Sequence, residues 1–96
     1  MLTQELLERV LAKVPDYQTF MTVDELDASS RRLAQEYPGV VSLTEIGKSR
    51  SGHPLLCLTI GCGSENAILY GCPHPNEPIG AMMLEAFSRI LAEDAE

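Results

Sequence analysis

The chain has 96 residues and a hydrophobic content of 45%, which suits one small domain with a modest core. Its formal net charge of -7 argues against anionic partners, so we expect neither nucleic acid nor a membrane surface to bind it. No apolar stretch has the length of a transmembrane helix, and acids at Glu5 and Glu8 stand where a signal peptide would have basic residues.

Two helices are predicted in the first part of the chain. Thr3 and Glu5 are suited to the start of a helix over 4–14, which Pro15 would end. Thr22 and Glu25 have the spacing of a capping box and predict a second helix over 22–37. Proline and glycine follow directly at 38–39 and would stop it.

Two strands are then predicted over 40–47 and 54–61. Their apolar residues alternate with polar ones, as in a half-buried strand. The intervening residues 48–52 contain serine and glycine and resemble a hairpin loop, so the two strands should be antiparallel neighbours.

A third strand is predicted over 67–72, because Ala67-Ile68-Leu69-Tyr70 is a short apolar run that suits burial on both faces. Apolar positions then recur at helical spacing and predict a helix over 78–92. The expected fold class is α/β, a three-layer arrangement in which helices flank a mixed sheet. That sheet would consist of the antiparallel pair and the buried third strand.

His74 and Glu77 lie in the loop between the third predicted strand and the last helix. Imidazole nitrogen and carboxylate oxygen are both good zinc ligands, and a spacing of three residues allows them to converge on one ion. An isolated H-x-x-E is more often a solvated turn than a metal site. Here the loop is expected at the carboxyl edge of a sheet, where ligands collect, and Pro73, Pro75 and Pro78 stiffen it.

The three cysteines, Cys57, Cys62 and Cys72, form neither an even disulfide set nor a C-x-x-C pair. We therefore expect free thiols and a cytoplasmic protein. Cys72 is close enough to His74 in sequence to be a metal ligand. A small apolar residue at a strand end is the better interpretation.

Two motifs in this order resemble a known family. A Gly-x-Ser-x-x-Gly-x-Pro hairpin occupies 47–54, and His74-x-x-Glu77 follows about twenty residues later. Together they resemble the opening of the zinc metallocarboxypeptidases, the carboxypeptidase A-like peptidases, over roughly residues 17–96. Pro75 departs from the small residue that many members have after the ligand histidine.

The resemblance implies one zinc ion bound by His74 and Glu77, with a distant third ligand, a general-base Glu and an Arg for the substrate carboxylate. None of these is expected among the 96 residues, because the only other histidine, His53, falls in the hairpin turn and is best interpreted as an exposed turn residue. We therefore expect residues 21–96 to be the amino-terminal portion of a larger catalytic domain, preceded by a helical extension over 1–20. No catalytic residue is assigned within the chain.

The expected function is hydrolysis of a carboxyl-terminal peptide bond, with the chain inactive when alone. Its expected partners are a peptide or small amide substrate and the remainder of the catalytic domain. Two alternatives stay open. One is a zinc amidohydrolase that acts on small N-acyl amino acids or γ-glutamyl cell-wall peptides, and the other is a non-enzymatic α/β interaction module.

Overall fold

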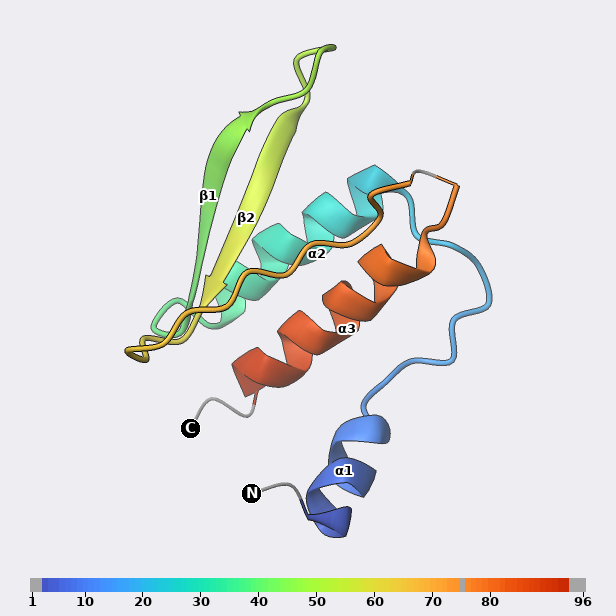
Figure 1. Cartoon of the computed structure of the whole chain (residues 1–96), viewed down its shortest axis with the longest axis vertical. Coiled ribbons are helices and arrows are strands. Elements are labelled where there is room, and N and C mark those ends of the chain that lie inside the picture. The colour runs from blue at the N-terminus through green and yellow to red at the C-terminus, as the bar shows by residue number, and fades with distance from the viewer. Residues whose placement is uncertain (1–2, 75, 94–96) are drawn as a thin grey trace.

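The computed structural model describes residues 3–74 and 76–93. Along the chain they form α1 (Gln4–Leu11), α2 (Val23–Glu36), β1 (Val41–Lys48), β2 (Pro54–Ile60) and α3 (Ile79–Glu93) (Figure 1). All five elements lie close to their predicted ranges. The α/β class is therefore confirmed.

The two strands form an antiparallel pair, as expected. Val41 pairs with Ile60 and Leu43 with Leu58, so apolar side chains stand opposite one another across the hairpin. An irregularity between Glu45 and Gly47 shifts the register near the hairpin loop.

The core lies where the hairpin meets the two longer helices. Val41 of β1 is only 3% exposed, and it clusters with Leu33 of α2 and Ala92 of α3. Leu58 and Ile60 of β2 pack against this cluster. Further along α3, Met82, Ala86 and Ile90 are also buried. The apolar stripe of α3 therefore faces the interior, as its helical spacing indicates.

Local capping explains where the first two helices begin. The Thr3 hydroxyl accepts a hydrogen bond from the backbone N–H of Leu6 at 3.1 Å. At α2, the Thr22 hydroxyl accepts from the Glu25 N–H at 3.2 Å, and the Glu25 carboxylate accepts from the Thr22 N–H at 3.0 Å. The predicted capping box is therefore formed in full.

The predicted third strand is wrong for the residues that the structure describes. Residues 67–72 belong to no strand, and the sheet is an antiparallel pair rather than a mixed sheet. Ile68 is 92% exposed and Tyr70 is 80% exposed, so the run is not buried either. The mixed sheet that was expected between the helices is consequently not shown.

The reason for this difference is that an apolar strand is buried only if other strands and helices cover it. In Figure 1 the segment runs from the end of β2 to the amino end of α3 without joining the hairpin. Among the described residues, the sheet consists of β1 and β2 alone, and the segment pairs with neither of them.

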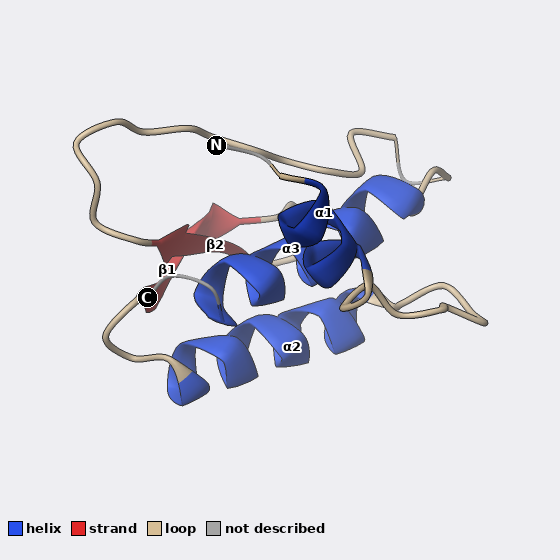
Figure 2. Ribbon diagram, turned by 90° about the horizontal axis from the view of Figure 1, so that it is seen from below, coloured by secondary structure: helices blue, strands red, loops and turns tan. Residues whose placement is uncertain are grey.

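The amino-terminal segment is attached to α3 by polar contacts rather than by a buried apolar face. No residue of α1 is buried. Lys13 forms an ion pair with Glu93 at 3.1 Å, and the Tyr17 hydroxyl donates to Glu85 at 2.5 Å. Figure 1 shows α1 apart from the α2 and α3 pair, and in Figure 2, which is seen from below, α1 lies in front of α3. In the described part of the chain, no helix is both long and apolar enough to cross a membrane.

Candidate metal site

His74 and Glu77 lie in one turn immediately before α3. The backbone N–H of Glu77 donates to the carbonyl of His74 at 3.0 Å, which closes the turn between them. Both side chains are exposed. Within the described residues, neither takes part in an ion pair or a side-chain hydrogen bond, so both are accessible to a metal ion from solvent.

The backbone on the amino-terminal side of this turn is unusual. Cys72 has a φ of 60°, the only positive φ of a non-glycine residue in the described part of the chain. Its thiol donates to the backbone carbonyl of His74 at 3.4 Å. Such a conformation is uncommon outside glycine, and it occurs two residues before the first candidate ligand.

Two glycines bring the ends of this loop into contact. A Cβ atom added to Gly71 would lie 2.7 Å from both the carbonyl carbon and oxygen of Gly80, and 2.9 Å from the Ala81 nitrogen. A Cβ atom added to Gly80 would lie 3.3 Å from the Cys72 nitrogen. The chain entering the loop therefore touches the first turn of α3 backbone to backbone, with His74 and Glu77 between the two contact points.

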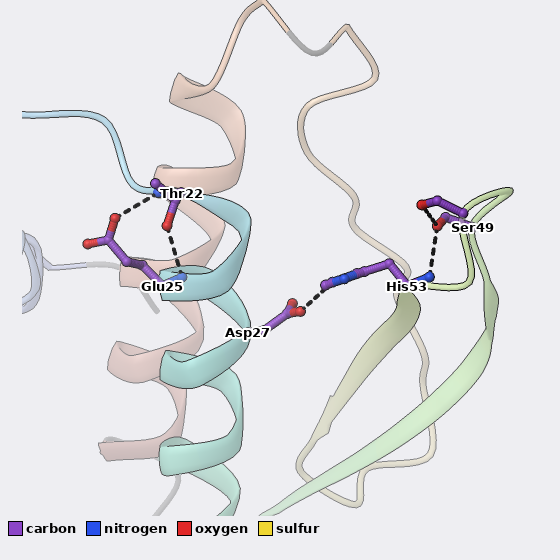
Figure 3. A network of polar contacts seen from close by, with 6 residues as sticks. Thr22, Glu25, Asp27, Ser49 and His53 are labelled. Carbon is purple, nitrogen blue, oxygen red and sulfur yellow. Dashed lines mark hydrogen bonds and ion pairs between the residues drawn. The ribbon is translucent and has the colours of Figure 1, made fainter.

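No group of three metal-binding side chains is present among the described residues. His53, the other histidine, lies on the hairpin loop, and its Nε2 is 2.7 Å from Oδ2 of Asp27 on α2 (Figure 3). Its backbone N–H also donates to the Ser49 hydroxyl at 3.1 Å. His53 thus links the hairpin loop to α2 through Asp27. It belongs to no metal-binding group with His74 among the described residues.

A second polar cluster was not predicted from the sequence. It centres on Glu85 of α3, whose side chain is only 10% exposed. This carboxylate accepts from Tyr17 at 2.5 Å, from Ser29 at 2.9 Å and from Arg89 at 2.7 Å. Desolvation, followed by the hydrogen bond and the charge of Glu85, raises the pKa of Tyr17 to about 12.

One sequence signal could have indicated this cluster. Glu85 falls among the apolar residues of α3, and a buried carboxylate needs partners. The sequence contains no sign that those partners would be Tyr17 and Ser29, which are far away along the chain.

The comparison with protein families covers this region of the chain. The family model described as zinc carboxypeptidase matches residues 26–96. The chain belongs to the zinc carboxypeptidase family. A comparison with curated proteins gave no match.

The residues of this zinc carboxypeptidase chain fit the metal that the family implies. His74 supplies an imidazole nitrogen and Glu77 a carboxylate oxygen, and both belong to the donor types that zinc prefers. They are close in the chain, exposed and held in one hydrogen-bonded turn. Pro75, which lies between His74 and Glu77 in the sequence, is outside the described residues.

Proposed function

We propose that the chain carries part of the zinc site of a metallocarboxypeptidase, and that His74 and Glu77 are two of its ligands. The supporting observation is that one backbone turn carries both residues just before α3, within the region matched by the family. Bound zinc would polarise the scissile carbonyl and activate a water molecule for hydrolysis of a carboxyl-terminal peptide bond.

The role of the chain's own residues follows from their chemistry. His74 has to present a neutral ring nitrogen, and Glu77 has to be ionised, because zinc binds the deprotonated forms of both groups. The exposure of both side chains leaves room for further ligands on the solvent side. A catalytic zinc usually has three protein ligands and a water molecule, so His74 and Glu77 need a third partner.

We further propose that this third ligand comes from the remainder of a catalytic domain, with residues 1–20 as an extension and 21–96 as its amino-terminal portion. An open groove with a volume of about 710 Å³ supports the proposal. It is lined by Ile46 of β1, by β2, by residues 65 and 67–71, and by one side each of α2 and α3. Ile68, Leu69 and Tyr70 in this lining are exposed, and a contiguous group of apolar side chains of this size is normally covered in a complete fold.

Peptides are the substrates that we propose for the complete enzyme, and the cytoplasm is the proposed location. The latter rests on the three free cysteines, which fit a reducing compartment.

Glu77→Gln in the complete enzyme tests the assignment of the ligands. The change keeps the size of the side chain and a carbonyl oxygen, but it removes the charge that attracts a divalent cation. We expect most of the zinc affinity and the activity to be lost together, with the fold retained, because an exposed loop side chain contributes little packing energy. His74→Ala should have the same effect.

Zinc content by elemental analysis, peptide turnover and circular dichroism measure these outcomes. Glu36→Gln is a matched control, since Glu36 is also an exposed acid and does not line the groove. Bound zinc and near-normal turnover in Glu77→Gln would show that Glu77 is not a ligand.

A further inference from the structure

The two ends of the loop that carries both candidate ligands are in contact with each other through their backbones. Gly71 stands before it, and Gly80 lies in the first turn of α3 after it. A Cβ atom added to Gly71 would lie 2.7 Å from backbone atoms of Gly80. At this separation the two backbone segments would have to move apart. The neighbouring atoms are backbone rather than a flexible side-chain end, so the strain could not be relieved by rotating a side chain.

This contact limits the ways in which the loop can be arranged. Both ends of residues 72–79 are held together at backbone distance, and the turn from His74 to Glu77 is closed by a hydrogen bond of 3.0 Å. A shift of one end would therefore be transmitted to the direction in which the His74 and Glu77 side chains leave the backbone. Metal affinity depends steeply on such geometry.

We infer that Gly71 and Gly80 are positioning residues, whose backbone contact sets the relative placement of His74 and Glu77 for one metal ion. The inference rests on the proposed function, because it concerns the same two ligands. It goes further in assigning a role to two residues that have no side chain and cannot touch the ion.

Gly80→Ala is the decisive variant. Its Cβ atom would stand 3.3 Å from the Cys72 nitrogen and 3.6 Å from the Gly71 Cα, so the contact must open by a few tenths of an ångström. Alanine is also a better helix former than glycine, which favours α3 itself. A purely structural role for Gly80 therefore predicts unchanged or higher stability and unchanged metal binding, whereas a positioning role predicts weaker binding without loss of stability.

The measurement is an NMR titration of the 96-residue chain with Zn²⁺, which also detects weak binding. The chain has two histidines, so the His74 ring signals report on the site, and those of His53 serve as an internal reference. We expect Gly80→Ala to weaken binding at His74 about tenfold or more, which is the size of effect found when the outer support of a metal site is disturbed. The melting temperature should not fall.

Two further variants complete the test. Gly63→Ala is the matched control, because a Cβ atom there meets nothing within 4 Å, and its Zn²⁺ affinity should equal that of the wild type. Gly71→Ala should weaken binding more than Gly80→Ala, since its contacts are shorter. If Gly71→Ala does not fold, Gly80→Ala decides alone.

The outcomes separate this inference from the proposed function. Wild-type binding that His74→Ala abolishes and Gly80→Ala leaves within twofold would overturn the positioning role and keep the ligand assignment. A wild-type chain whose His74 signals do not respond to Zn²⁺ would overturn both.

Discussion

Tyr17→Phe removes one hydroxyl from the partly buried cluster around Glu85 and leaves the aromatic ring in place. The lost interaction is a hydrogen bond of 2.5 Å to a carboxylate that Ser29 and Arg89 continue to contact. Hydrogen bonds to charged groups contribute about 1.5–3 kcal/mol. Because Tyr17 is partly open to solvent, screening reduces this, and we expect a loss of about 1–2 kcal/mol in the free energy of unfolding.

That loss is large for a chain of this size. Even a complete domain is stabilised by only about 5–15 kcal/mol in total. At about 4–8 °C per kcal/mol, Tyr17→Phe should lower the melting temperature by about 5–15 °C at neutral pH. Thermal unfolding followed by circular dichroism measures the change. Tyr70→Phe is the control and should have no effect, since Tyr70 is 80% exposed.

The pH dependence of the stability difference between the wild type and Tyr17→Phe gives a second test. The pKa of Tyr17 is raised from 10.0 to about 12 in the folded chain, so folding favours the neutral hydroxyl. Its contribution is present in full below pH 10 and is lost as the pH rises towards 12. The difference in stability between wild type and Tyr17→Phe should therefore shrink over this interval. A difference that is absent at pH 7, or constant up to pH 12, would refute the reasoning.

Two further predictions concern the core and the chain's activity. Leu33→Ala should lower the free energy of unfolding by about 2–4 kcal/mol in a denaturant titration, because Leu33 is only 7% exposed. Ile68→Ala, at a position that is 92% exposed, should lower it little. Equal losses in the two variants would contradict the assigned core. The 96-residue chain by itself should bind zinc weakly and release no carboxyl-terminal residues from peptides, because the described residues contain no group of three ligands; chelator-resistant, stoichiometric zinc would be the opposite result.

The helices and the hairpin follow from local sequence. Thr22 and Glu25 satisfy each other's backbone groups within one turn, so their spacing is enough to predict where α2 begins. The hairpin was predictable for a similar reason, since its loop is short and its apolar residues alternate. His74 and Glu77 are also neighbours in the chain, and their turn before α3 needed no distant contact to be recognised.

Only the tertiary structure decided the features that depend on distant parts of the chain. The apolar run at 67–70 was predicted to be a buried strand, but its burial depends on neighbours that the run itself cannot specify, and the described residues leave it exposed. Glu85 gained its partners because folding brings Tyr17 and Ser29 to α3. The contact between Gly71 and Gly80 likewise arises when the loop closes onto the helix, since glycine in a sequence shows that a close approach is allowed without showing what approaches.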